Sequence, residues 1–345
     1  MRAAIYEAFQ GPVEVRRCDD PAPTPDGVVL RVRATGICRS DWHGWMGHDP
    51  DISVPQVPGH EIAGEIAEVG SEVASWHVGD RVTLPFVCGC GNCGQCASGN
   101  EQVCDRQFQP GFTHWGSYAE YVSIHYAERN LVALPDDMDF VTAASLGCRF
   151  ATAYRGIVAQ GRLQQGEWLA VHGCGGVGLA AVMIGQALGG RVVAVDIDDA
   201  ALGLASAMGA EVTLNARQEP SVVDAIRAAS SGGVQVSVDA LGSRETCTNS
   251  IRSLAKRGRH VQIGLLAGEH RHPPLPMELV IANELEIVGS HGMQAHAYGE
   301  MLQMIDDGRL APRKLVGSTT DLESAARQFV VDYQPAAPGV SVIVF

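Results

Sequence analysis

Four cysteines stand close together in the first third of the chain: Cys90, Cys93, Cys96 and Cys104. The first three recur at every third residue, and a short loop can fold the fourth back onto them. Four thiolates fill every position of a tetrahedral zinc site, and such a closed site is structural. We therefore predict a structural zinc that holds a glycine-rich lobe with little apolar mass of its own. Redox thiols, or a zinc ribbon that binds protein or nucleic acid, are the alternatives.

A glycine-rich loop follows further along the chain, with Gly173, Cys174, Gly175, Gly176, Val177 and Gly178. It comes directly after the apolar run Trp168–His172, and it opens a helical pattern. In that context the spacing is typical of a dinucleotide-binding turn, because glycines let the backbone approach a pyrophosphate at the positive end of a helix. Taken alone, the motif would be as typical of a simple turn.

Asp196 ends the next apolar run and indicates which nucleotide binds. Its carboxylate can accept hydrogen bonds from the adenosine ribose hydroxyls, and it would repel a 2′-phosphate. Asp198 and Asp199 add negative charge, and the next basic residue is Arg217. These charges predict NAD rather than NADP. A helix cap is the plainer interpretation of Asp196.

Cys38, His60 and Cys148 are candidates for a second metal site, although they lie far apart in the sequence. Cys38 follows an apolar run that reads as a strand, and His60 stands in the segment Pro58-Gly59-His60-Glu61. Each residue taken singly is more often a buried thiol or a packed histidine. A second site therefore needs support from the rest of the chain.

The elements that must position these residues differ between the two halves of the chain. The first 135 residues are rich in β-branched residues, glycine and proline, and in 28–34 the residues Val28, Leu30, Val32 and Ala34 share one face of a strand. This half predicts an antiparallel β domain. A helical segment is expected from Asp139 to about Gln160.

Strand and helix patterns then alternate, which predicts an α/β fold with a doubly wound parallel sheet of the kind that binds dinucleotides. Helical patterns such as Ala200–Met208 and Ser221–Ala229 lie between most of the strands. One or two helices and a last strand, Val340–Phe345, are expected in the tail. The six strand candidates are Trp168–His172, Arg191–Asp196, Glu211–Leu214, Val234–Ala240, Arg259–Gly264 and Leu285–Gly289.

Composition limits the possible functions. A chain of 345 residues with 46% hydrophobic content is sufficient for two domains. The formal net charge of −14 argues against a nucleic-acid partner. No apolar run reaches the length of a membrane helix, and the N-terminus does not read as a signal peptide. We therefore expect a cytoplasmic protein, in which the count of ten cysteines indicates metal binding or catalysis rather than disulfides.

Taken together, the motifs resemble those of the zinc-containing medium-chain alcohol dehydrogenases, within the medium-chain dehydrogenase/reductase superfamily. The resemblance covers essentially the whole chain, and Gly111–Ser117 is similar to the microbial, tetrameric branch. It rests on the order and spacing of Cys38-Arg39-Ser40-Asp41, Gly59-His60-Glu61, the four cysteines, Gly147-Cys148 and the loop Gly173–Gly178.

The resemblance implies a GroES-like catalytic domain, with the zinc lobe, over residues 1–147 and 290–345. An NAD-binding Rossmann domain would cover residues 148–289. The chain would form a homotetramer or homodimer and bind two zinc ions, one structural and one catalytic. The resemblance implies that Cys38, His60 and Cys148 hold the catalytic zinc. It also implies that Glu61 would bind the metal transiently while the ligand at the open position is exchanged.

The resemblance also assigns a proton relay and further contacts. Ser40 would take the proton of the alcohol and pass it through the cofactor ribose to His43, which suits release near neutral pH. Arg39 would contact the pyrophosphate and Thr152 the nicotinamide. The family often has a basic residue soon after the ribose-binding acid, and Asp199-Ala200-Ala201 offers none. Candidates for the lining of the alcohol pocket are Phe86, Trp42 and Trp115.

The expected activity is the zinc-assisted, NAD-linked, reversible oxidation of an alcohol to an aldehyde or ketone. A polyol or threonine-type dehydrogenase is the first alternative, and the aromatic pocket candidates speak against it. A zinc-free quinone or enoyl reductase would have no use for the second metal set. A non-enzymatic zinc module would make that set incidental. Cysteines left outside both sites are read as small hydrophobic residues: Cys18, Cys88, Cys174 and Cys247.

Overall fold

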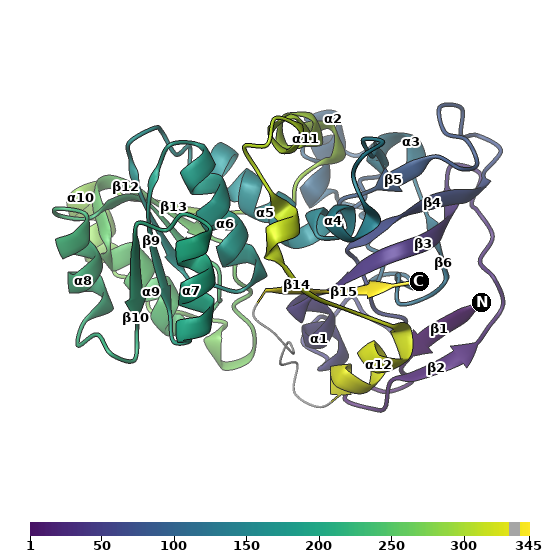
Figure 1. Cartoon of the computed structure of the whole chain (residues 1–345), viewed down its shortest axis with the longest axis horizontal. Helices are drawn as coiled ribbons and strands as arrows, with labels where there is room; N and C mark the ends of the chain where they lie inside the picture. Colours follow the sequence, from purple (N-terminus) through teal and green to yellow (C-terminus); the bar gives the residue numbers. More distant parts are fainter. Residues whose placement is uncertain (331–338) are drawn as a thin grey trace. The chain divides into compact units, whose positions relative to one another are not determined.

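The computed structural model describes residues 1–330 and 339–345 (Figure 1). By the contacts between its residues, the chain divides into two units. The domain boundaries indicated by the sequence, at 147/148 and 289/290, stay a proposal. Unit 1 comprises Met1–Ala151, Gly292–Gln303 and Pro312–Phe345, and unit 2 comprises Thr152–His291 and Met304–Ala311.

Unit 1 is built on a seven-stranded sheet in which the order is β14-β15-β3-β4-β5-β7, with β6 also paired to β3. β14 and β15 are parallel, and the other pairs are antiparallel. The C-terminal strand β15 thus lies beside β3 from the start of the chain (Figure 1). The strands are β3 (Val28–Ile37), β4 (Ile62–Val69), β5 (Arg81–Thr83), β6 (Tyr121–Ile124), β7 (Val132–Ala133), β14 (Val316–Thr320) and β15 (Val340–Val344).

The alternating apolar residues of β3 share one buried face, as the sequence predicts. Val28, Leu30 and Val32 are buried in one core cluster with Ile62 and Ile66 of β4. A second cluster lies around the small sheet of β1 (Arg2–Ile5) and β2 (Glu14–Arg17), where helix α12 (Leu322–Val330) packs. The other helices of this unit are short: α1 (Arg39–Trp45), α2 (Gly94–Ala97), α3 (Ala127–Asn130) and α4 (Phe140–Ala144). Helix α11 (Tyr298–Asp306) begins in unit 1 and ends in unit 2.

Unit 2 is a six-stranded parallel sheet in the order β10-β9-β8-β11-β12-β13. Numbered within the unit, this is the order 3-2-1-4-5-6 of the dinucleotide-binding fold, whose ligand crevice lies where the order reverses, between β8 and β11. The doubly wound sheet predicted from the sequence is confirmed. Its strands are β8 (Trp168–His172), β9 (Arg191–Asp196), β10 (Val212–Asn215), β11 (Val234–Asp239), β12 (Leu254–Gln262) and β13 (Glu286–Gly289).

Helices cover both faces of this sheet. Gly185 of α6 (Gly176–Ala187) lies against Leu169 and Val192, and α7 (Asp199–Ala207) packs beside α6. The alternate side chains of the same strands pack with α8 (Val222–Ala229) and α9 (Arg244–Arg252). Helices α5 (Ala151–Arg155) and α10 (Met277–Asn283) complete the unit.

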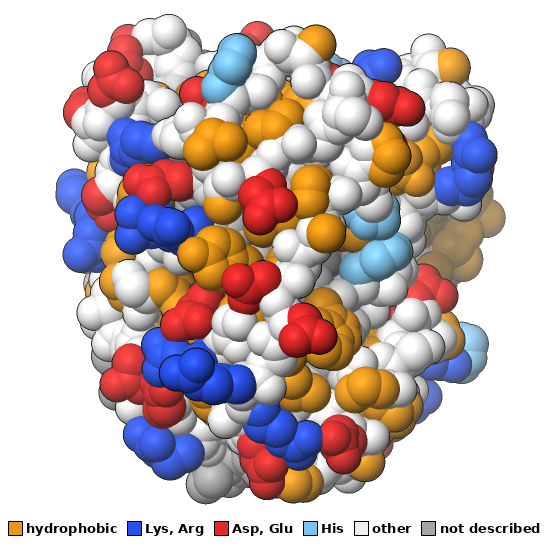
Figure 2. Space-filling model, turned by 90° about the vertical axis from the view of Figure 1, so that its right-hand side faces the viewer, with side chains coloured by type: hydrophobic (Ala, Val, Ile, Leu, Met, Phe, Trp, Pro, Cys, Tyr) orange, Lys and Arg blue, Asp and Glu red, His pale blue; other side chains and the backbone are white. Residues whose placement is uncertain are grey.

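Two surface features bear on function. On the face shown in Figure 2, basic and acidic side chains are interspersed, and no broad basic area is visible. None of the helices in the described ranges is long and apolar enough to cross a membrane.

Candidate active site

Cys38, His60 and Cys148 come together in unit 1. One ligand atom from each, and one carboxylate oxygen of Glu61, all lie within 4.8 Å of one another. His60 and Glu61 are fully buried, and Cys38 is nearly so. Two sulfurs and one imidazole nitrogen are a donor set that suits zinc with a position left open for substrate.

Neighbouring strands bring the first two of these residues together. Cys38 directly follows β3 and caps the start of α1, and His60 directly precedes β4. Because β3 and β4 are antiparallel, with Thr35 opposite Ile62, the end of one strand meets the start of the next. Gly59 makes the entry possible: its φ is 105°, in the region that favours glycine, and a Cβ there would collide with Tyr118.

Cys148 is placed by a turn that the sequence did not predict. The helix expected from Asp139 to about Gln160 is interrupted by two π-helical turns, Leu146–Phe150 and Gly156–Gln160. A π turn inserts one extra residue into the helical repeat, and such turns are frequent at functional sites. The first of them carries Cys148 and Arg149, so it sets the directions of both side chains.

Asp41 orients His60 and was given no role in the sequence analysis. Its carboxylate accepts hydrogen bonds from His60 Nδ1 at 2.8 Å and from the backbone N–H of Gly59 at 2.8 Å. The Cys38 N–H at 3.3 Å and the Tyr118 hydroxyl at 3.4 Å also donate to it. His60 Nε2 is buried and has no hydrogen-bond partner among the described residues. A histidine fixed at one nitrogen by a carboxylate, with the other nitrogen free, is the usual arrangement of a zinc ligand.

The two sulfurs are close enough to share a proton. The hydrogen bond between them holds the pKa of Cys38 well below its usual value, against the effect of burial. The same bond, together with burial, raises the pKa of Cys148 well above its usual value. A divalent cation binds thiolates and displaces such protons, so the residues fit the metal that their chemistry implies.

Glu61 is held by Arg149 in a buried ion pair. Arg149 Nε donates to Glu61 Oε1 at 2.9 Å, the Arg149 backbone N–H donates to the same oxygen at 3.1 Å, and Nη2 contacts Oε2. Arg149 Nη1 also donates to the carbonyl of Ile37 at 3.1 Å, next to Cys38. A Cβ at Gly36 would collide with the Glu61 carboxylate, so only glycine leaves room for the pair. Motion of Glu61 onto a metal would require exchange of these bonds.

Ser40 and His43 both lie on α1, after the zinc-ligand candidate Cys38. Cys38 Sγ lies 3.7 Å from Ser40 Oγ, within hydrogen-bond distance, which places the hydroxyl at the edge of the cluster. His43 is half-buried, and its Nδ1 lies 3.0 Å from His48 Nδ1. Burial, followed by the charges of Arg39 and His48, lowers the pKa of His43 to about 4. His43 is therefore neutral at physiological pH, rather than titrating near it as its residue type indicated.

The aromatic pocket candidates separate in the structure. The ring of Phe86 lies 5.9 Å from that of His60, and Phe112 lies 5.0 Å from the same ring. Trp42 lies edge-on to His43 at 5.1 Å. Trp115 donates from Nε1 to the carbonyl of Pro55 at 3.1 Å and lines a cavity of about 170 Å³ whose lining includes none of the cluster ligands. Phe112 belongs to the segment Gly111–Ser117, and its residue type alone did not indicate a place beside His60.

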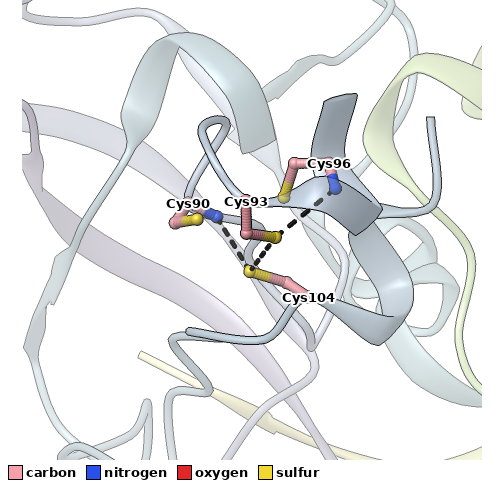
Figure 3. A group of neighbouring side chains, drawn as sticks. All are labelled: Cys90, Cys93, Cys96 and Cys104. Atoms are coloured by element: carbon pink, nitrogen blue, oxygen red, sulfur yellow. Dashed lines mark hydrogen bonds between the residues drawn. The ribbon is translucent and has the colours of Figure 1, made fainter. Parts of the chain in front are cut away.

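The four cysteines of the lobe form a second cluster (Figure 3). Their sulfurs lie within 4.8 Å of one another, and all ten cysteines of the chain are free of disulfides. The backbone N–H of Cys90 donates to Cys104 Sγ at 3.3 Å, and that of Cys96 donates to Cys93 Sγ at 3.5 Å. Such bonds stabilise thiolates, and that from Cys96 is the main cause that lowers the pKa of Cys93 to about 6. All four positions of a tetrahedral metal would be filled from the chain.

Cys104→Ser is expected to lower thermal stability before it affects chemistry, because a structural zinc contributes folding energy directly. The melting temperature of the zinc-loaded protein should fall by several degrees, and the rate of alcohol oxidation well below that temperature should be nearly unchanged. Calorimetry and a rate assay at low temperature measure the two effects. An unchanged melting temperature would refute the structural role.

The glycine loop of unit 2 lies where the sequence predicts, between β8 and α6. Gly173 has φ 92°, which a tight turn requires, and a Cβ at Gly178 would collide with the Gly173 carbonyl. Gly175 caps the start of α6, and its Cβ position is open space, so a ligand can approach the backbone there. The three glycines thus meet the three requirements of a pyrophosphate-binding turn, and Gly176 and Val177 begin the helix.

Asp196 ends β9 and braces the loop. One carboxylate oxygen accepts from the Cys174 N–H at 2.6 Å, and the other accepts from the N–H groups of Ile197 at 2.7 Å and Asp198 at 3.0 Å. Its position at the carboxyl end of the second strand suits a ribose hydroxyl. The cap of α7 is Asp198, so the helix-cap interpretation of Asp196 was wrong.

The remaining cofactor candidates are placed separately. Thr152 is nearly buried in unit 2, and its hydroxyl has no hydrogen-bond partner in the described part of the chain. Arg39 is exposed in unit 1, with its guanidinium 5.9 Å from the ring centre of Trp42. The roles of both side chains in cofactor binding stay predictions.

Three features together define the class of protein as a zinc-dependent, nucleotide-linked dehydrogenase. They are the closed four-sulfur cluster, the open set of two sulfurs and one imidazole, and the dinucleotide-binding sheet. Comparison with known families agrees with this class. Residues 24–136 match the alcohol dehydrogenase GroES-like domain, and residues 176–307 match the zinc-binding dehydrogenase domain.

Individual relatives cover nearly the whole chain. An alcohol dehydrogenase of Geobacillus stearothermophilus is 34% identical over 90% of both chains. An NAD-dependent alcohol dehydrogenase of Saccharolobus solfataricus is 32% identical over 94% of both chains. The structure of an alcohol dehydrogenase from Thermus sp. ATN1 superposes with a TM-score of 0.90 at 29% identity, covering 100% of this chain and 99% of that one. The chain belongs to the zinc-containing medium-chain alcohol dehydrogenases.

Proposed function

We propose that this chain oxidises an alcohol reversibly to an aldehyde or ketone, with NAD as hydride acceptor and zinc held by Cys38, His60 and Cys148. The observation that carries the proposal is the buried Nε2 of His60, which lies beside two sulfurs and has no hydrogen-bond partner within 1–330 and 339–345. Zinc bound there would supply a Lewis acid that makes the hydroxyl group of the substrate more acidic. The relatives are named alcohol dehydrogenases, which does not favour the polyol or threonine-type alternative.

Other side chains would position the zinc ligands, transfer the proton and bind the cofactor. Asp41 holds His60, and the Arg149 pair holds Glu61 beside the ligands. Ser40 would accept the proton of the substrate hydroxyl and His43 would release a proton to solvent, and the ribose of bound cofactor would supply the hydroxyl that connects them. In the same proposal Arg39 and the turn Gly173–Gly178 bind the pyrophosphate, while Thr152 contacts the nicotinamide. Phe86 and Phe112 supply apolar rings 5.9 Å and 5.0 Å from the ring of His60.

Metal analysis tests the site assignment directly. We expect two zinc ions per chain, because one cluster offers four sulfur ligands and the other offers the three protein ligands of an open site. Removal of the four-sulfur cluster by Cys93→Ser and Cys96→Ser should leave one. A single zinc in the unaltered chain, however purified, would contradict the catalytic site and would favour the zinc-free reductase alternative.

Asp196→Gly is expected to relax the exclusion of NADP, since it removes the carboxylate that would repel a 2′-phosphate. The ratio of kcat/KM with NAD to that with NADP should fall by about tenfold or more. Asp199→Asn removes a nearby charge of the same sign and is the matched control, which should change the ratio much less. An unaltered ratio in the Asp196 variant would refute the charge argument.

We also propose that the protein is cytoplasmic and that it forms a homotetramer or a homodimer. β13 is an edge strand of its sheet, and α10 before it has no buried residue. Ile281 is 78% exposed, Met277 49% and Ile287 38%. An unpaired strand edge next to exposed apolar side chains favours association with a second copy.

A further inference from the structure

The turn that ends α1 brings a second histidine onto His43. Gly47 has φ 80°, its N–H donates to the Gly44 carbonyl at 2.9 Å, and the His48 N–H donates to the His43 carbonyl at 3.0 Å. These are the two hydrogen bonds of a Schellman motif, which brings the third-last helical residue together with the second residue beyond the cap. In this chain those two residues are His43 and His48.

The two imidazoles meet through one specific pair of atoms. His43 Nδ1 and His48 Nδ1 are 3.0 Å apart, and the ring centres are separated by 5.3 Å with an angle of 41° between the planes. Trp42 lies edge-on to both rings, at 5.1 Å and 6.0 Å. A hydrogen bond between two imidazole nitrogens contains one proton, so one Nδ1 donates and the other accepts.

We propose that His48 is a positioning residue for the proton relay: its Nδ1 accepts from Nδ1–H of His43 and leaves the lone pair of His43 on Nε2. The inference rests on the proposed function, in which His43 receives the proton. An arriving proton forms a new N–H bond at Nε2 and gives an imidazolium whose Nδ1–H stays bonded to His48. The same Nε2–H bond then breaks as the proton passes to water, and the pair returns to its starting state.

The surroundings of His43 make such an acceptor useful. Burial, the charge of Arg39 and a charge on His48 each lower the pKa of His43, and among the named groups only the Cys38 sulfur raises it. His48 therefore supports a proton on His43 only as a neutral hydrogen-bond acceptor. Protonated His43 is therefore a costly intermediate. An imidazolium with an unpaired Nδ1–H in a half-buried site would cost more, because a buried donor without a partner pays its full desolvation penalty.

Two substitutions at His48 test this role. His48→Phe keeps a ring beside Trp42 and removes the acceptor, so kcat for alcohol oxidation near neutral pH should fall about tenfold. His48→Asn keeps an oxygen that can accept from His43 Nδ1 and should recover most of that loss. In both variants the zinc content, the Kd of NAD and the KM of the alcohol should be unchanged. His77→Asn, at a side chain that is 78% exposed, is the control.

Nitrogen NMR of the zinc-loaded protein gives a readout that does not depend on turnover. We expect His43 to carry its proton on Nδ1 in the unaltered chain and to lose this preference in the Phe variant. A proton on Nε2 of neutral His43, or an unchanged kcat in the Phe variant, would overturn the inference about His48. Equal damage by Phe and Asn would also overturn it. The proposed function is tested separately, because it requires only that the unaltered chain oxidises an alcohol.

Discussion

Cys38→Ser is expected to abolish alcohol oxidation while the chain stays folded. The serine is close in size to the buried thiol, so the packing after β3 should survive. It does not provide a thiolate, and the open metal site would lose one of three protein ligands. Lewis-acid stabilisation of the transition state contributes several kcal/mol, and about 1.4 kcal/mol corresponds to tenfold in rate. We therefore expect kcat/KM to fall by at least about a thousandfold.

The measurement combines turnover, metal content and melting temperature. The variant should retain one zinc ion per chain, in the four-sulfur cluster, with a melting temperature close to that of the unaltered chain. Cys18→Ser is the matched control, because that half-buried thiol lies outside both clusters. Turnover within a few-fold of normal in the Cys38 variant would refute the ligand assignment.

Arg149→Met is expected to destabilise the fold strongly. It removes the partner of a fully buried carboxylate, Glu61, and the donor to the carbonyl of Ile37. Breaking a buried ion pair from one side costs about 3–5 kcal/mol, because the remaining charge is left uncompensated. Urea denaturation of the zinc-loaded protein should show a loss of this size.

A double variant separates the charge from the packing. Arg149→Met combined with Glu61→Gln removes both charges and should recover a substantial part of the lost stability. Arg162→Met breaks the ion pair with Glu286, in which both side chains are about half exposed, and should cost less than about 1 kcal/mol. If Arg149→Met costs no more than Arg162→Met, the buried pair is not important for stability.

The regular strands of unit 2 could be predicted closely because they are short apolar runs between turn signals. The predicted bounds of β8 and β9 coincide with those observed. β12 begins at Leu254, five residues earlier than expected, because the ladder is irregular: Leu254 pairs with Val234 and Arg259 with Val236. Pattern alone cannot reveal such a bulge, since two basic residues and a glycine between Leu254 and Arg259 interrupt the apolar run and are typical of a turn.

The site was harder to predict wherever tertiary contacts decide the outcome. The ligand residues could be named from motifs, but the π turn that directs Cys148 has no signature in residue types. Asp41 belongs to the motif that contains Cys38, but its role could not be predicted because its four hydrogen bonds involve residues as distant in sequence as Tyr118. Trp115 was a pocket candidate because it is aromatic, whereas its hydrogen bond to the Pro55 carbonyl could not be read from the sequence. The fold could be predicted from local sequence patterns, whereas the directions of the side chains at the site could be determined only from the structure.

The most direct test of the central claim is the formation of NADH by the zinc-loaded protein with a panel of primary and secondary, aliphatic and aromatic alcohols. We predict that NADH absorbance rises with at least one of these alcohols, that NADP supports a much lower rate, and that the Cys38→Ser variant shows no rise. A protein with two bound zinc ions and bound NAD that reduces the cofactor with none of these alcohols would contradict the assignment.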